Sequence, residues 1–420
     1  MKAGFYTIMA AQFFSALADS ALIVPAIALL RELSSPAWMT PALKQSLVIP
    51  YVVLAPLVGA FADSMPKGRV MLITNAIKII GCGAMLFSVH PLAAYAIVGI
   101  GAAAYSPAKY GILTELLPPQ QLVAANGWIE GATVASIVLG AVLGGFLISP
   151  RVSTMLLSFD LPIIDTPVDT APEAAISVIM GFYFIAAVFN WFVPHTGVDH
   201  RVPSKNPLYL IREFSHCVVL LWTDRLGQIS LATTTLFWGA GATLQFILLE
   251  WLQRTLGFNL SQSSMLSGMV VIGVLIGAVL AARLVTLRGS VKVLPIGMVM
   301  GAGVMLIVFV HQLPLAIGMM IVIGACAGFF VVPMNALLQH RGHVLMGAGH
   351  SIAVQNFNEN VGILVMVGLY ALMVRAGLSI NFAIVLFGSF VAGTMLLVFW
   401  RHRYNQSRSD SLRLIGYEKH

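Results

Sequence analysis

The chain has 420 residues, of which 59% are apolar and only 9% are charged. Roughly a quarter of the residues of a soluble domain are charged, so this composition excludes a water-soluble globular protein. Only Cys82, Cys217 and Cys326 are present, too few and too scattered for a disulfide framework or a thiolate metal site. A net charge of +7 could indicate nucleic-acid binding, but in a membrane protein the place of each charge matters more than the sum.

Long apolar runs reach the ~20 residues that cross ~30 Å of hydrocarbon. They are too long and too continuously apolar for the strands of a membrane barrel. The first run is also too long for a cleavable signal peptide, so it counts as a span. The sequence predicts an all-α membrane protein with twelve transmembrane helices, near 5–30, 44–62, 70–89, 91–114, 122–149, 175–194, 228–252, 262–286, 291–311, 313–337, 345–374 and 379–400.

Charges and prolines are dense in 195–226, which predicts a cytoplasmic linker containing an amphipathic helix. This linker separates an N-terminal six-helix half, 1–194, from a C-terminal six-helix half, 227–400, which a basic cytoplasmic tail, 401–420, follows. With both termini on one side, most of the 23 Lys and Arg residues lie on that side, and those opposite are Arg31, Lys44, Arg151, Arg254 and Arg375. The positive-inside rule therefore predicts cytoplasmic termini. Segment 150–174 is predicted to be an acidic, irregular excursion on the outer face.

The turn after the second predicted span has the spacing of a known transporter motif. Gly59, Asp63, Lys67 and Arg69 match the G-x-x-x-D-x-x-x-[KR]-x-[KR] loop of the major facilitator superfamily. Glycine allows close helix approach, the carboxylate can accept hydrogen bonds from a neighbouring helix start, and the two bases suit the cytoplasmic side. We predict that these four residues form a cytoplasmic gate between two rocking halves. An ordinary basic cytoplasmic turn is the alternative.

The second half repeats parts of the first. A copy of the loop without its acidic residue runs from Gly277 to Arg288. Ser106-Pro-Ala-Lys109 is echoed by Val332-Pro-Met-Asn335, and the Asn126–Glu130 stretch is echoed by Asn356–Asn360. This predicts the major facilitator fold, in which two pseudo-symmetric halves repeat one six-helix plan.

Four stretches carry a more specific resemblance: AQFFSALADSAL (11–22), GAAAYSPAKYGIL (101–113), GFFVVPMNALLQHRG (328–342) and IAVQNFNEN (352–360). They resemble the lysophospholipid transporter family, and the likeness covers nearly the whole chain. The resemblance implies a multi-pass protein of the bacterial inner membrane that moves lysophospholipids, chiefly lysophosphatidylethanolamine, to the inner leaflet. It also implies a functional partner, an acyltransferase/acyl-acyl-carrier-protein synthetase, that reacylates them.

Charged residues inside spans are costly and mark candidate functional sites. Asp19, Lys109, Glu130 and Glu359 are such residues, and Asn356 lies near the last of them. Lysine and carboxylates at bundle depth could exchange their mutual pairing for a phosphate and an ammonium, so we predict a substrate pathway there. The alternative is that these charges pair only to hold the helices together.

One position departs from the family pattern. The resemblance implies an arginine in the seventh helix, a natural partner for Asp19, where this sequence has Gln245. We place Gln245 in the predicted pathway, with either a neutral hydrogen bond to Asp19 or a different partner for that carboxylate.

The sequence contains neither a phosphate-binding loop nor a nucleophile elbow. We expect a transporter rather than an enzyme, with no cofactor and no nucleic-acid partner. His340, His343 and His350 cluster in one turn, but we predict no metal site from them. A proton-coupled exporter of amphipathic drugs, with Asp19 or Glu359 as proton carrier, is the alternative function.

Overall fold

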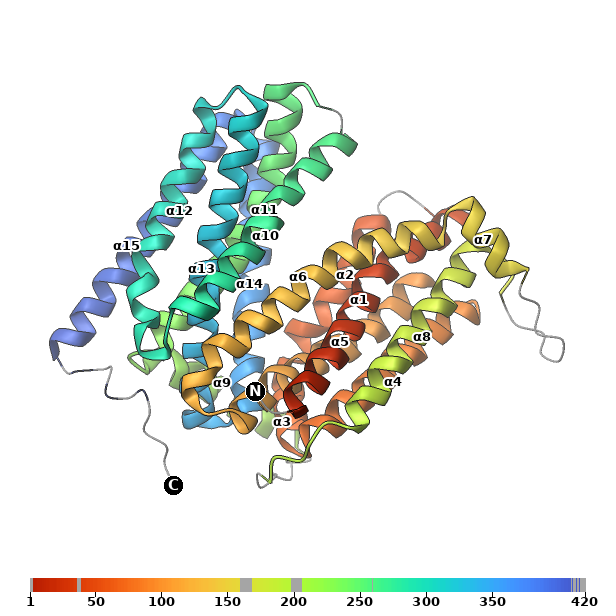
Figure 1. The fold of residues 1–420 in the computed structure, drawn as a ribbon, viewed down its shortest axis with the longest axis horizontal. Helices are drawn as coiled ribbons and strands as arrows, with labels where there is room; N and C mark the ends of the chain where they lie inside the picture. Colours follow the sequence, from red (N-terminus) through yellow and green to blue (C-terminus); the bar gives the residue numbers. More distant parts are fainter. Residues whose placement is uncertain are drawn as a thin grey trace. The chain divides into compact units, whose positions relative to one another are not determined.

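In the computed structural model the chain is described over residues 3–35, 39–158, 168–197, 206–258, 260–408, 410, 413 and 415. All regular elements in these residues are helices (Figure 1). The α-helices are α1 (Ala3–Glu32), α2 (Met39–Val53), α3 (Ala55–Asp63), α4 (Lys67–Leu86), α5 (Pro91–Leu116), α6 (Leu122–Leu147), α7 (Pro150–Leu157), α8 (Ala171–Trp191), α9 (Pro207–Thr223), α10 (Gly227–Leu256), α11 (Leu260–Leu284), α12 (Leu294–Leu306), α13 (Leu313–Met346), α14 (Ala348–Arg375) and α15 (Ile380–Arg408). Short 3-10 turns lie at Pro119–Gln121, Leu287–Val293 and Ile307–Phe309.

The described residues hold 11 helices that are long and apolar enough to cross a membrane, or up to 12 with one bent pair. That pair is α2 and α3, which meet at 68°. Pro56, at the start of α3, has no backbone N–H and cannot continue the hydrogen-bond pattern of α2, so the helix breaks at this proline. The all-helical architecture and the predicted number of spans are confirmed.

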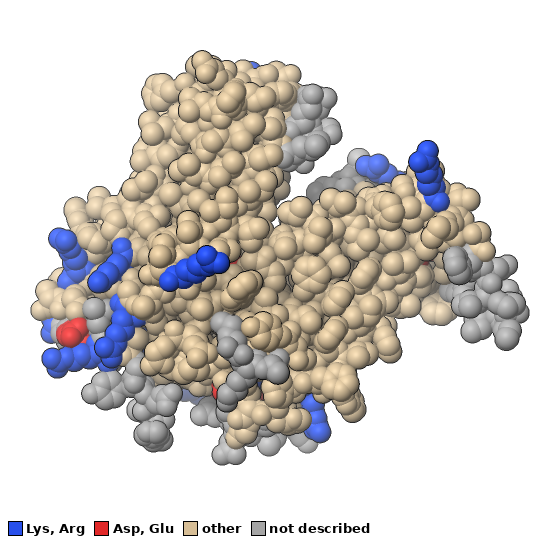
Figure 2. All heavy atoms as spheres, in the orientation of Figure 1, with Lys and Arg blue, Asp and Glu red and all other residues tan. Residues whose placement is uncertain are grey.

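Few charged side chains lie on the visible outer face of the described helices (Figure 2). Figure 2 shows a mostly uncharged surface on its visible face, with many Lys and Arg near helix ends, among them the basic end of α15. Arg401, Arg403 and Arg408 are exposed there. Uncharged helix sides are what contact with hydrocarbon requires.

Chain contacts divide the protein into two compact units, described separately here. Unit 1 comprises Met1–Leu116, Ala132–Phe214 and Ala348–Ala353. Within it α1 packs on α8, α4 packs on α5 and α8, and α2 packs on α5. One apolar core of this unit includes Leu22, Tyr95 and Tyr183, each at most 1% exposed.

Unit 2 comprises Leu117–Gly131, Ser215–Gly347 and Val354–His420. Its tightest contact joins α11 and α13, where glycines spaced four apart face each other's backbone. A Cβ on Gly273 or Gly277 would overlap carbonyl oxygens of α13, and one on Gly324 or Gly328 would overlap carbonyl oxygens of α11. Small residues at this spacing let two membrane helices pack backbone to backbone. Gly277, predicted from the repeat, thus has a packing role.

Two segments differ from the sequence predictions. The excursion at 150–174 is not irregular throughout, because α7 occupies its first residues; residues 159–167 lie outside the described part of the chain. The last helix continues to Arg408, into the predicted tail. The helix predicted in the linker, by contrast, is present as α9. The division into halves at 195–226 stays a prediction.

Candidate functional site

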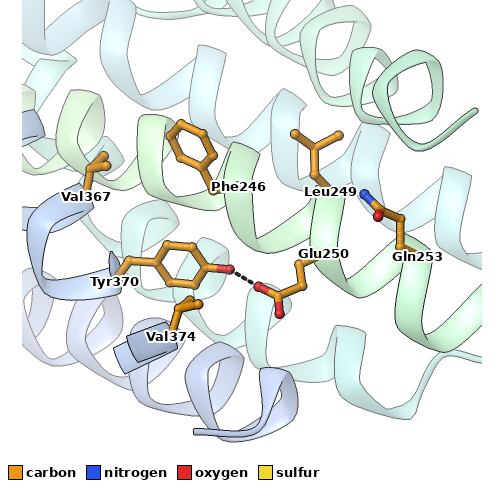
Figure 3. A pocket seen from close by; sticks show the side chains of 7 residues that line it. All are labelled: Phe246, Leu249, Glu250, Gln253, Val367, Tyr370 and Val374. Carbon is orange, nitrogen blue, oxygen red and sulfur yellow. Dashed lines mark hydrogen bonds between the residues drawn. The ribbon is translucent and has the colours of Figure 1, made fainter. Parts of the chain in front are cut away.

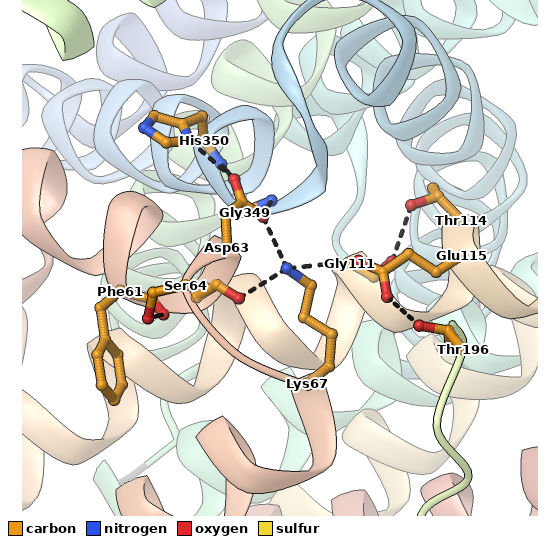
Figure 4. Close-up of polar contacts among 11 residues, drawn as sticks. Phe61, Asp63, Ser64, Lys67, Gly111, Thr114, Glu115, Thr196, Gly349 and His350 are labelled. Atoms are coloured by element: carbon orange, nitrogen blue, oxygen red, sulfur yellow. Dashed lines mark hydrogen bonds and ion pairs between the residues drawn. The ribbon is translucent and has the colours of Figure 1, made fainter. Parts of the chain in front are cut away.

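The predicted cytoplasmic gate forms a connected set of polar contacts inside unit 1 (Figure 4). We call this set the gate cluster: Asp63, Lys67, Glu115, Thr196, Gly349 and His350. Asp63 ends α3, Lys67 begins α4, Glu115 lies near the end of α5, and Gly349 and His350 lie in the first turn of α14.

Asp63 is the centre of the cluster. It accepts backbone N–H groups from Gly349 at 2.8 Å and from His350 at 3.1 Å. The Nδ1 atom of His350 lies 2.8 Å from the same carboxylate. The first N–H groups of a helix have no partner within the helix and carry a partial positive charge, so an anion there is favourable. The sequence predicted acceptance from a neighbouring helix start, and the structure contains that contact.

Lys67 is buried, with 3% of the residue exposed, so its charge requires partners. Its ammonium lies 2.6 Å from Asp63 and 3.4 Å from Glu115, and it donates to the Ala62 carbonyl at 2.7 Å. Glu115 in turn accepts from the Thr196 hydroxyl at 2.8 Å. Lys67 therefore contacts two carboxylates at once, and the sequence had not identified Glu115 as one of its partners.

Two glycines make the approach of α14 possible. A Cβ at Gly59 would lie 3.1 Å from the Cα of His350, and a Cβ at Gly349 would lie 2.6 Å from the Oδ1 atom of Asp63. Arg69, the fourth predicted gate residue, is exposed. Three of the four predicted gate residues therefore lie in or against the cluster, and their role as a gate stays a prediction.

Asp19, which is half-buried, forms an ion pair with a fully buried lysine within unit 1. Its carboxylate lies 2.8 Å from the ammonium of Lys78 on α4 and accepts from the Tyr183 hydroxyl on α8 at 2.7 Å. The side chain of Lys78 is 0% exposed and also donates to Ser15 at 3.0 Å. The rings of Tyr105 and Tyr183 lie 4.8 and 5.4 Å from its ammonium. Aromatic faces add further stabilisation to a cation removed from water.

Lys78 is the residue that the sequence reasoning missed. We predicted for Asp19 either Gln245 or a different partner, and the structure has a different one. Lys78 lies inside an apolar run of the sequence, and the energetic cost of a charge in a span was enough to mark it as a candidate. Gln245 belongs to unit 2 and its side chain is exposed.

Lys109 is buried on α5, with 8% of the residue exposed, and its ammonium lies 4.1 Å from the ring centroid of Tyr110. Helix α5 continues through Pro107, two residues before Lys109. Lys109 and Asp19 are the predicted pathway residues of unit 1.

The other predicted pathway residues belong to unit 2, where two of them, Glu130 and Glu359, join one buried network. Glu130 accepts from Asn335 at 3.3 Å. Gln355 donates to Asn335 at 3.0 Å and to Glu359 at 2.7 Å. These four residues are each at most 7% exposed. Asn356, half-buried beside them, accepts a hydrogen bond on its backbone oxygen from Asn360.

Sequence reasoning placed Glu130 and Glu359 in this region but named no role for Asn335 or Gln355. The internal repeat was a signal, because it aligned Asn335 with Lys109 and placed the Asn356–Asn360 stretch, which contains Glu359, opposite the stretch that ends in Glu130. A second pair, Asn126 and Gln339, exchanges two side-chain hydrogen bonds at 2.8 and 2.9 Å.

The chemistry available in both units is that of charged and amide groups held away from water. Such groups can bind a charged head group by exchanging partners, at the cost of breaking existing bonds. In the described part of the chain no three His, Cys, Asp or Glu side chains gather as a metal site.

Comparisons with known proteins define the class first. Residues 8–341 match the family model described as Major Facilitator Superfamily. The fold is similar to that of the human organic anion transporter MFSD10 (TM-score 0.69, 17% identity, 96% of this chain and 100% of that one). It is also similar to that of a bacterial homologue of the iron transporter ferroportin in an outward-facing state (TM-score 0.71, 14% identity, 97% and 100%). The class is thus a transporter of the major facilitator fold.

Relatives with higher identity narrow the family. A Yersinia enterocolitica protein named lysophospholipid transporter LplT is 41% identical over 381 residues, covering 90% of this chain and 89% of that protein. A protein of the same name from Yersinia pestis is 42% identical over 371 residues, covering 88% and 86%. The chain belongs to the lysophospholipid transporter LplT family of the major facilitator superfamily.

Proposed function

We propose that this protein moves lysophospholipids, chiefly lysophosphatidylethanolamine, across the bacterial inner membrane to the inner leaflet. The observation that carries the proposal is the match to relatives named lysophospholipid transporter over about nine tenths of the chain. The apolar helices and their buried charges are compatible with a substrate that has a charged head group and one acyl chain.

Transport would proceed by alternating access, with the lipid approaching laterally from the bilayer so that its acyl chain stays in apolar surroundings. The buried charges and amides, Asp19 with Lys78 and Glu130 with Glu359 among them, would receive the head group. The gate cluster would hold the cytoplasmic turns together in one state and release them in another. A partner acyltransferase/acyl-acyl-carrier-protein synthetase would then reacylate the lipid.

The test is leaflet-resolved transport in liposomes that contain the purified protein. Labelled lysophosphatidylethanolamine and diacyl phosphatidylethanolamine are supplied to one leaflet, and albumin extracts the lysolipid left there. We expect the lysolipid to change leaflets faster than in protein-free liposomes, and the diacyl lipid to stay. Equal rates for both lipids, or no acceleration, would contradict the proposal. Transport of amphipathic drugs that stops when the proton gradient is dissipated would support the exporter alternative.

A matched pair of variants tests the pathway. Lys109→Met removes a buried ammonium, and Lys292→Met removes an exposed one in the turn before α12. We expect the first to lower lysolipid transport by at least about tenfold, because a charge-assisted contact contributes ~1.5–3 kcal/mol. The second should transport at the wild-type rate. Unchanged transport by the Lys109 variant would remove that residue from the pathway.

A further inference from the structure

A pocket in unit 2 lies outside the predicted pathway. It has a volume of ≈ 430 Å³, is shallow and widely open, and is formed by the later turns of α10 and α14 (Figure 3). Its lining residues are Phe246, Leu249, Glu250, Gln253, Val367, Tyr370 and Val374. This volume is within the range of small-molecule sites, which combine apolar walls with a few polar groups.

The polar groups of the pocket form a chain of three. The Tyr370 hydroxyl donates to the Oε2 atom of Glu250 at 2.5 Å, as Figure 3 shows. The Oε1 atom of the same carboxylate lies 2.6 Å from the guanidinium of Arg254, one turn further along α10. Tyr370 is buried with 8% exposed, whereas the side chains of Glu250 and Arg254 are 24% and 60% exposed. The carboxylate is therefore oriented from the buried side and accessible from the open side.

The acidic and basic groups lie at one end of a membrane-spanning helix. Glu250 lies six residues before the end of α10 at Leu256, near the end of the predicted span at 228–252, and Arg254 lies just beyond that span. Their pairing adds little to helix stability, because a pair spaced four residues apart on a helix surface contributes only a few tenths of a kcal/mol. A ligand that uses both charges would account for their place in an apolar pocket.

We propose that this pocket binds the phosphoethanolamine head group of a lysophospholipid, an inference that rests on the proposed function. The guanidinium of Arg254 matches a phosphate, because its planar N–H groups can bind two phosphate oxygens at once. Glu250 matches the ammonium, and Tyr370 keeps its carboxylate in place. The head group thus exchanges with an existing pair of opposite charges, and neither protein charge loses its partner.

The apolar wall accounts for the rest of the lipid. Phe246, Leu249, Val367 and Val374 can contact the glycerol and the first methylenes, while the open side leaves the single acyl chain in the bilayer. The charge distribution predicts that this end of α10 is on the periplasmic side, since Arg254 is among the bases opposite the termini. The pocket is accordingly a first binding site for lysolipid in the outer leaflet.

This assignment makes a prediction about head-group selectivity. Lysophosphatidylethanolamine has both charges, whereas lysophosphatidylglycerol has the phosphate without the ammonium. Glu250→Gln should weaken binding of the ethanolamine lipid about tenfold and leave the glycerol lipid nearly unchanged. Arg254→Gln should weaken binding of both. Tyr370→Phe, which keeps the ring and removes the hydroxyl, should weaken the ethanolamine lipid by a smaller factor.

The experiment measures equilibrium binding of the two radiolabelled lysolipids to the purified full-length protein in nanodiscs. Arg413→Gln is the control, because it removes an equally basic side chain from an exposed pair with Asp410 in the C-terminal segment. We expect the control to bind like the wild type, and melting temperatures show that each variant is folded. A Glu250→Gln variant with the wild-type ratio of affinities for the two lipids would overturn the pocket assignment. The ratio of affinities for the two lipids tests the pocket assignment, and the leaflet-resolved assay tests transport, so each proposal can fail without the other.

Discussion

Removing the cation from the buried pair of unit 1 gives the most direct test of its energetics. Lys78→Met keeps the length of the side chain and leaves Asp19 with the Tyr183 hydroxyl alone. Breaking a buried ion pair by deleting one member typically costs ~3–5 kcal/mol. The Asp19 side chain is 29% exposed, so water can compensate part of the loss. We therefore expect the lower end of this range, ~3 kcal/mol of unfolding free energy.

Deleting the other member should cost more. Asp19→Asn leaves the ammonium of Lys78, whose side chain is 0% exposed, with an amide oxygen, a serine hydroxyl and two tyrosine rings but without a negative charge. Water cannot reach that ammonium, so we expect ~4 kcal/mol or more. The double variant, Asp19→Asn with Lys78→Met, leaves no uncompensated charge and should be within ~1 kcal/mol of the wild type.

The assay is denaturant unfolding of the purified protein in detergent, followed by circular dichroism, for the wild type, both single variants and the double variant. Lys292→Met is the control, because an exposed lysine should change stability by no more than ~0.5 kcal/mol. Single-variant costs that simply add in the double variant would show that the two charges are not coupled, and the reasoning would be refuted. A stable double variant that no longer transports lysolipid would show that the pair also serves transport.

Two further predictions concern stability. Gly349→Ala should lower the melting temperature, because its Cβ would lie 2.6 Å from a carboxylate oxygen of the gate cluster; Gly393→Ala, which meets nothing within 4 Å, should leave it equal or raise it. An equal effect of both would contradict the packing argument. Gln355→Leu should cost ~2–3 kcal/mol of unfolding free energy, because it removes a buried donor to Glu359, whereas Gln245→Leu, at an exposed position, should cost under ~0.5. Equal stability of these two variants by denaturant unfolding would argue against the network.

The spans could be predicted from the sequence because hydrocarbon imposes one rule on every helix, namely a long run without charges. The break between α2 and α3 was harder, since the predicted second span near 44–62 runs across it. Pro56 was the visible signal of the break, but Pro107, which lies inside α5, does not interrupt that helix. The same residue type therefore has different outcomes, which depend on the neighbours that satisfy the freed backbone groups.

The partners of the charged residues could not be predicted in the same way. The motif spacing placed Asp63 and Lys67 four residues apart, at the two ends of the short connection between α3 and α4, so their pairing follows from the local chain. Glu115 and His350 reach the cluster through the rotation of α5 and α14, which a single sequence does not specify. The same holds for Asp19 and Lys78, whose 2.8 Å contact joins two helices. The energetic cost of a charge inside a span identifies such residues individually, but only the packing of the helices shows which residues form pairs.

Within unit 2, helix α14 connects the buried network to the lipid pocket. Gln355 and Glu359 lie in its third and fourth turns, and Tyr370 lies in a later turn. From Gln355 to Tyr370 the helix extends ~22 Å, and no proline interrupts it. If Glu359 exchanged Gln355 for a head group, a shift or rotation of this stretch of helix would move the wall of the lipid pocket with it. The partners of Glu359 and the occupancy of the pocket should therefore influence each other.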